Sequence, residues 1–163
     1  MRRFLGSILS LALLLVGVSV TATMPAYGGF CILPPVPGPV VGEYAPIGRY
    51  QGHWGVDLAA SEGSTVVAPV AGEVTFAGKV AGVLAVTVRH EDGYWVSVSS
   101  LQRIDTEQGT VLEAGDAVGR SGRHAGKAAV HVSLRDTDGY RDPEPFLGCA
   151  RPGRVRLIPV SEA

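Results

Sequence analysis

The middle of the chain alternates between apolar and polar positions. Between residues 128 and 135, Val130, Val132 and Leu134 fall on one face, and His131 lies in the middle of the more polar face. A period of two predicts a half-buried strand over 129–135. Similar valine-rich runs, bounded by glycine-containing turns, predict further strands over 65–70, 72–78, 84–90 and 94–101.

No long run of helix-forming residues separates these segments, and the Asp92-Gly93 pair is typical of a hairpin turn. Strands that follow one another without intervening helices predict an all-β fold, an antiparallel sandwich or a barrel-like stack of sheets. The predicted core spans residues 48–148.

The two ends of the chain differ in composition from this core. Arg2 and Arg3 precede an apolar run that ends near Val20, which predicts a secretory signal peptide over residues 1–26. The alternative is an uncleaved membrane anchor, for which the run is short. Residues 27–47 are proline-rich and predict an extended arm, and residues 149–163 form a C-terminal tail.

The net charge and the two cysteines bear on the binding partners and on the cellular compartment of the protein. A formal net charge of −1 over 163 residues gives no electrostatic signal for binding nucleic acid or anionic membranes. The two cysteines, Cys31 and Cys149, flank the predicted core. In an oxidising compartment an even count favours a disulfide bond, and the alternative is two free thiols.

The stretch GHWGVDLAA contains the candidate chemistry. His53 and Asp57 are four residues apart with Gly55 between them, and imidazole and carboxylate are both zinc donors. Such a pair is common by chance, so a surface turn is the competing interpretation.

Several segments in order resemble the lysostaphin-type (LytM) zinc metallopeptidases, which cleave peptides of bacterial peptidoglycan. GHWGVDLAASEGSTVVAPVAGEVTFAG resembles the opening of that family, LAVTVRHEDG its valine-rich strand, and GTVLEAGDAVG its glycine-punctuated turn. AVHVSLRDTDGYRDPEPFL resembles its closing strand and Asp-Pro hairpin. The chain looks most similar to a short, exported actinobacterial branch of the family.

The resemblance implies a β-fold of the LytM type, the duplicated hybrid motif, with one Zn²⁺ held by His53, Asp57 and His131. Three protein ligands with water in the fourth position would form an open, catalytic-type site. A different register would make His131 catalytic and Ser133 the ligand, but it breaks the match downstream.

Two auxiliary histidines of the family have no counterpart here, because the matching positions are Ser100 and Ala129. His124, in the segment before the last predicted strand, is a candidate substitute base. Its alternative role is that of a solvated loop residue between Arg123 and Lys127.

These observations favour a secreted, zinc-binding protein of the cell envelope with impaired catalysis, which binds peptidoglycan or regulates its hydrolysis. The alternative is an active zinc metalloendopeptidase that cleaves peptidoglycan cross-link peptides. The expected partners are peptidoglycan or its peptides, with other cell-wall hydrolases as further candidates. A biotin- or lipoyl-type carrier is disfavoured, since neither Lys79 nor Lys127 lies in a suitable hairpin tip.

Overall fold

The computed structural model describes residues 29–49 and 51–148, and within them the regular secondary structure is β-strand apart from one short 3-10 helix. An 11-stranded sheet follows the order β1-β4-β12-β8-β7-β6-β9, with β10, β5, β11 and β13 joined to it off this path. A separate pair is formed by β2 and β3. All strand pairings are antiparallel, as the predicted all-β fold requires.

The strands of the first half are β1 (Val40–Gly42), β2 (Ala45–Ile47), β3 (Gln51–His53), β4 (Val56–Ala59), β5 (Thr65–Val67), β6 (Gly72–Val80) and β7 (Val83–Arg89). The second half adds β8 (Trp95–Ile104), β9 (Val111–Leu112), β10 (Ala117–Ser121), β11 (Arg123–His124), β12 (Lys127–Asp136), β13 (Gly139–Arg141) and the 3-10 helix η1 (Glu144–Phe146). Among the described residues no helix is long and apolar enough to cross a membrane.

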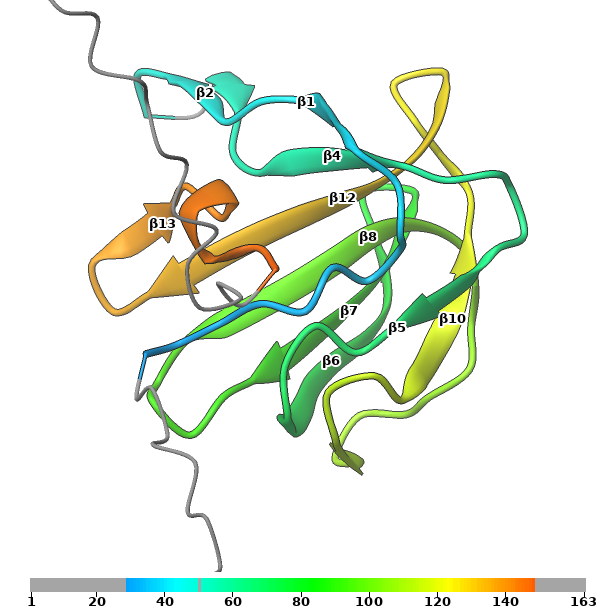
Figure 1. Cartoon of the computed structure of the whole chain (residues 1–163), viewed down its shortest axis with the longest axis vertical. Helices are drawn as coiled ribbons and strands as arrows, with labels where there is room; N and C mark the ends of the chain where they lie inside the picture. The colour runs from blue at the N-terminus through cyan, green and yellow to red at the C-terminus, as the bar shows by residue number, and fades with distance from the viewer. Residues whose placement is uncertain (1–28, 50, 149–163) are drawn as a thin grey trace, which may run out of the picture.

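The long strands β12, β8, β7 and β6 lie side by side as one twisted layer, and β5 with β10 lies at its end (Figure 1). Their apolar faces form the core. On β12, Val130, Val132 and Leu134 are fully buried, while His131 and Ser133 on the opposite face are half-buried. The alternation predicted for this strand is therefore confirmed.

The proline-rich segment packs against the same core. Ile32 and Val36 are almost completely buried, and the Val67 N–H donates to the Pro35 carbonyl at 3.0 Å. Farther along, β1 pairs with β4 in a register that places Val40 opposite Leu58. The segment predicted as an arm thus belongs to the same folded unit as residues 48–148.

The first and last described residues lie close together. Ile32 forms a parallel bridge with Leu147, and the Gly148 N–H donates to the Ile32 carbonyl at 2.9 Å. The predicted signal peptide, the tail and Cys149 lie outside the described residues, so the Cys31–Cys149 bond stays a prediction.

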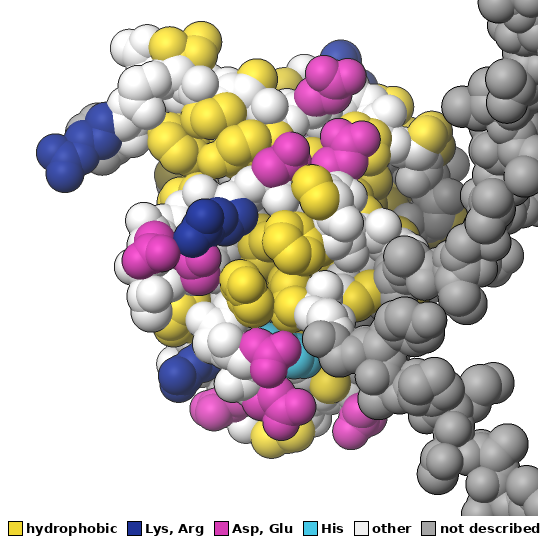
Figure 2. Space-filling model, turned by 60° about the vertical axis from the view of Figure 1, so that its left-hand side comes forward, with side chains coloured by type: hydrophobic (Ala, Val, Ile, Leu, Met, Phe, Trp, Pro, Cys, Tyr) yellow, Lys and Arg dark blue, Asp and Glu magenta, His cyan; other side chains and the backbone are white. Residues whose placement is uncertain are grey.

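The surface in the view of Figure 2 has mixed character. Apolar side chains gather between groups of acidic ones, and basic side chains lie singly among them. This face therefore carries no large patch of a single charge, in keeping with the formal net charge of −1.

Candidate metal centre

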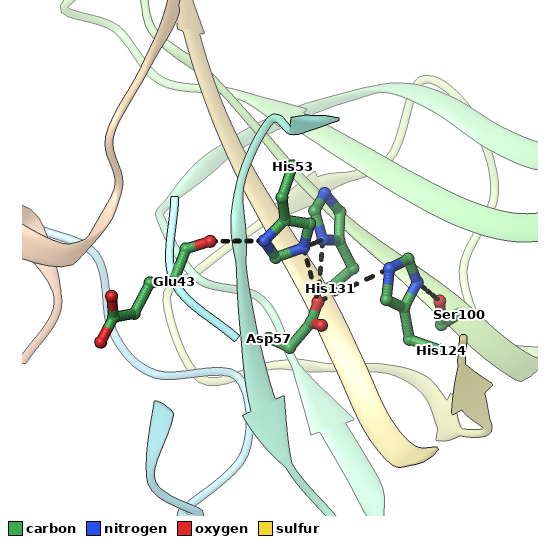
Figure 3. A network of polar contacts seen from close by, with 6 residues as sticks. All are labelled: Glu43, His53, Asp57, Ser100, His124 and His131. Atoms are coloured by element: carbon green, nitrogen blue, oxygen red, sulfur yellow. Dashed lines mark hydrogen bonds and ion pairs between the residues drawn. The ribbon is translucent and has the colours of Figure 1, made fainter. Parts of the chain in front are cut away.

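Four side chains from four strands converge at one place: His53 of β3, Asp57 of β4, His124 of β11 and His131 of β12 (Figure 3). Each offers one nitrogen or oxygen atom, and these four atoms all lie within 4.8 Å of one another. Three histidines and one aspartate form a donor set typical of zinc.

The three residues predicted as ligands form the tightest part of this group. His53 Nε2 lies 3.1 Å from Asp57 Oδ1, and His131 Nδ1 lies 3.0 Å from each of these two atoms. Strand register explains part of this convergence, because His131 is directly opposite Asp57 in the β12–β4 pair. Their role as ligands stays a prediction, but the structure brings all three together.

Gly55 is required by a close approach at this site. A Cβ atom at residue 55 would lie 2.6 Å from Cε1 and 2.7 Å from Nε2 of His131, and 2.3 Å from the Val132 carbonyl oxygen. Any side chain here would displace both the imidazole and the backbone of β12 at Val132. The glycine between His53 and Asp57 therefore makes room for the histidine of a distant strand.

The hydrogen bonds of His53 indicate that a cation fits between His53, Asp57 and His131. Nδ1 of His53 donates to the Glu43 carbonyl at 2.6 Å, because a carbonyl oxygen can only accept. In the neutral ring, Nε2 then carries a lone pair, and this lone pair faces the Asp57 carboxylate.

His131 supplies at most one proton to this triangle of atoms. Burial lowers the pKa of His131, although the hydrogen bond to Asp57 opposes this effect, so its ring is held toward the neutral form. One proton on Nδ1 cannot satisfy three contacts of 3.0–3.1 Å between His53, Asp57 and His131. A single divalent cation attracts all three atoms at once, so the residues present fit a zinc ion.

Ser100 and Ala129, the two positions at which the resemblance predicts missing histidines, have different surroundings. Ser100 occupies a β-bulge, since Leu84 pairs with Leu101 and Ala85 with Ser99, and its φ is +65°. Its hydroxyl reaches Nδ1 of His124 at 2.8 Å. Ala129 is completely buried on the same face of β12 as His131.

His124 is not a solvated loop residue. It pairs with Lys127 in a hairpin whose two turn residues, Ala125 and Gly126, have φ of +46° and +81°. This turn aims the imidazole at the site, where Nε2 lies 3.8 Å from Asp57 Oδ1. Its role as a base stays a prediction.

His90 lies elsewhere, as expected for a residue outside the site. Its Nδ1 accepts from the Asp92 N–H at 3.2 Å, and its ring contacts Phe30 edge-on at a centroid distance of 5.3 Å.

Sequence reasoning missed two partners in the centre. The Glu43 carbonyl is a backbone atom and leaves no signal in the residue pattern. The contact between Ser100 and His124 joins residues 24 positions apart. The glycine of the Ala125-Gly126 turn was the one available clue to it.

Comparison with known proteins places these features in context. The model of peptidase family M23 matches residues 51–143, a span that includes all four converging side chains. A search of the curated proteins gives no match.

Solved structures share the fold. The catalytic domain of the antimicrobial peptidase lysostaphin from Staphylococcus simulans is 25% identical with a TM-score of 0.56, covering 67% of this chain and 91% of that one. A mutant of the catalytic domain of the prophage-encoded M23 protein EnpA from Enterococcus faecalis is 25% identical with a TM-score of 0.56, covering 72% and 93%. Helicobacter pylori Csd3 is 23% identical with a TM-score of 0.63; the alignment covers 75% of this chain but 36% of the Csd3 chain.

Proposed function

The chain belongs to peptidase family M23, and from this premise we propose that it is an exported zinc-binding protein of the cell envelope that binds peptidoglycan with little turnover. The observation that carries the proposal is the convergence of His53, Asp57 and His131 at 3.0–3.1 Å, together with serine and alanine at the two auxiliary positions. Metal binding is retained in this interpretation, and proton transfer is reduced.

Zinc would be held by His53, Asp57 and His131. When bound, it supplies a Lewis acid that can polarise a peptide carbonyl and acidify a bound water. The chain's own residues orient these ligands: the Glu43 carbonyl fixes the ring of His53, and Gly55 leaves space for the ring of His131.

Impaired catalysis follows from the side chains at positions 100 and 129. Neither serine nor alanine can take the place of an imidazole that moves a proton near neutral pH. General acid–base catalysis typically contributes about 10²–10⁴-fold, so the loss of both groups would leave slow hydrolysis at most. A protein of this kind would act as a peptidoglycan binder, or as a regulator of other wall hydrolases.

Export is supported by residues 1–26 and by the position of the cysteines. Cys31 and Cys149 each adjoin a residue of the Ile32–Gly148 hydrogen bond. A disulfide closing so long a loop would stabilise the fold by on the order of 4–5 kcal/mol. Alkylation followed by intact-mass measurement, with and without reductant, tests it, and two alkylated cysteines without reduction would contradict it.

The alternative function is an active zinc metalloendopeptidase. It is favoured by one observation, the imidazole of His124 beside Asp57 at 3.8 Å, which would serve as the base in place of the missing histidines. In this case the substrate would be a peptidoglycan cross-link peptide.

Metal analysis, sedimentation with purified peptidoglycan and a muropeptide cleavage assay on the same preparation distinguish these functions. We expect about one zinc per chain, co-sedimentation with peptidoglycan, and cleavage far slower than that of lysostaphin assayed in parallel. His90→Ala, outside the site, is the matched control for Asp57→Ala. A preparation without zinc would contradict the proposal, and chelator-sensitive cleavage at the lysostaphin rate would establish the alternative.

A further inference from the structure

We propose that His124 is a fourth protein ligand of the zinc ion, so that the position open to water in a catalytic site is closed here by an imidazole. The inference rests on the proposed zinc-binding function. It rests also on the observation that the donor atoms of His53, Asp57, His124 and His131 all lie within 4.8 Å of one another.

The position of His124 fits four-coordination. Zinc–nitrogen bonds of about 2.0–2.1 Å in a tetrahedron place neighbouring donors roughly 3.3 Å apart. His124 Nε2 lies 3.8 Å from Asp57 Oδ1, and all four donor atoms lie within 4.8 Å of one another, so the His124 side chain has to move toward the other three donors to complete the set. The His124 ring also lies against that of His131, with an interplanar angle of 19° and a centroid distance of 4.9 Å, so the two imidazoles are in contact beside Asp57.

The Ser100 hydroxyl contacts Nδ1 of His124, as the Glu43 carbonyl contacts Nδ1 of His53. The Glu43 carbonyl accepts from Nδ1 of His53, which leaves the Nε2 lone pair facing the site. The Ser100 hydroxyl lies 2.8 Å from Nδ1 of His124, and when it accepts that proton the Nε2 of His124 likewise faces Asp57 with a lone pair. Histidine ligands of metals commonly have such an outer partner, which fixes the tautomer and the ring orientation.

The hairpin that carries His124 is anchored on its outer side. Arg123 contacts the Glu62 carboxylate and the Gly126 carbonyl, so its guanidinium is engaged away from the centre. On the inner side, the Gly122 N–H donates to the Ser100 carbonyl at 2.8 Å and ties the start of the hairpin to β8. His124 is therefore carried by a hairpin that is tied both to β8 and to Glu62.

A centre with four protein ligands is of the closed, structural type. Such a site binds metal but has no position for a water nucleophile or a substrate carbonyl. Closure by His124 and the losses at positions 100 and 129 would then act in the same direction, away from hydrolysis.

The test compares the full wild-type chain with His124→Ala, and uses His90→Ala as the control. Zinc affinity is measured by competition with a chelator, and the site is also loaded with Co²⁺ so that its absorption spectrum reports on coordination. We expect His124→Ala to weaken zinc binding by at least about tenfold, because the loss of even an outer partner of a ligand typically costs about 10–100-fold in metal affinity. His90→Ala should leave zinc affinity unchanged.

The cobalt spectrum then identifies the fourth ligand. Water bound to the metal of an open site ionises near pH 7, so an open site gives a spectrum that titrates in this range and changes on addition of thiocyanate. We expect the wild-type spectrum to do neither and the His124→Ala spectrum to do both. A long-range ¹H–¹⁵N correlation spectrum of the zinc-loaded wild type, which needs no variant, should show Nε2 of His124 bound to metal and Nδ1 protonated.

Two results would overturn the inference. A wild-type cobalt spectrum that titrates near pH 7, or an Nε2 of His124 without metal, would place water in the fourth position and leave the proposed zinc-binding function intact. A wild-type chain that binds neither metal would remove both proposals together.

Discussion

Asp57 and His131 lie directly opposite each other in the regular β12–β4 register, and His53 lies on the separate β2–β3 pair, whereas Ser100 and His124 lie on a bulge and on a two-residue hairpin. In the regular half of the site, formed by His53, Asp57 and His131, the donor atoms lie 3.0–3.1 Å apart. In the irregular half, formed by Ser100 and His124, Nε2 of His124 lies 3.8 Å from Asp57 Oδ1. Within the half proposed to bind zinc, the pairing of the sheet therefore fixes Asp57 relative to His131. The other half depends on local backbone features that a few substitutions can rebuild, and it is the half that differs from the resembled family.

The largest expected effect comes from rebuilding the irregular half. We predict that Ser100→His and Ala129→His, combined with His124→Ala to vacate space, raise muropeptide cleavage by about 10²–10⁴-fold, because they would place proton-transfer groups beside the proposed zinc ion. The two histidines act as a unit, so neither alone need help.

The same triple variant with Asp57→Ala added is the control, since it should be inactive. A triple variant that keeps its zinc but cleaves no faster than the wild type would show that more than these side chains separates the chain from an active enzyme.

The regular half is tested by removing one donor. Asp57→Ala should weaken zinc binding by more than about 100-fold, beyond the usual cost of losing an outer partner of a ligand. Competition with a chelator measures the change. Asp92→Ala, an exposed carboxylate beside His90, serves as the control; a loss of less than tenfold for Asp57→Ala would mean that this carboxylate is not a ligand.

The space reserved by Gly55 predicts a smaller effect. Gly55→Ala should lower the free energy of unfolding by about 1–3 kcal/mol, the usual cost of overpacking, because the new methyl group would collide with the Val132 carbonyl oxygen and with the His131 ring. Urea denaturation measures it. Gly29→Ala, where an added Cβ meets nothing within 4 Å, should change stability little; equal stability of both variants would show that the His131 ring and the backbone at Val132 can both move aside at little cost.

The regular half was also the predictable half. Alternation along residues 129–135 predicted both the strand and the half-buried face of His131, because the two-residue period of a strand determines which face a side chain occupies. The pair His53 and Asp57 was visible as a motif, and the resemblance linked it to His131. Each predicted strand overlaps an observed one, and β5 ends at Val67, two residues before Pro69, which has no N–H to donate to a partner strand.

The geometry of the irregular half could not be predicted from the sequence, and the reasons are physical. A serine at φ +65° has no sequence signature, because the bulge depends on how β7 and β8 align. The direction of His124 depends on the left-handed conformations of Ala125 and Gly126, of which only the glycine is an ordinary choice. The Glu43 carbonyl orients His53 through a backbone atom that any residue would supply.

The smallest expected effect is a dependence of stability on pH in the metal-free protein. Burial lowers the pKa of His131 below its ordinary value of 6.5, and charge repulsion from His124 and His53 acts in the same direction. The hydrogen bond and the charge of Asp57 only partly oppose this decrease. At pH values between this lowered pKa of His131 and 6.5, the unfolded chain therefore binds a proton at residue 131 that the folded chain does not bind. The free energy of unfolding should rise as pH increases toward 6.5 and be insensitive to this residue above it, with a slope of at most about 1.4 kcal/mol per pH unit for one group.

Urea denaturation of the metal-free wild type and of His131→Gln, which cannot titrate, isolates this contribution as the difference between the two slopes. NMR titration of the His131 ring should give a midpoint below 6.5. A midpoint at or above that value would mean that Asp57 outweighs burial, and that the cationic form of His131 is stabilised in the metal-free site. The carboxylate and the imidazole of the regular half would then be held together by a proton in the absence of metal, and zinc would have to displace that proton in order to bind.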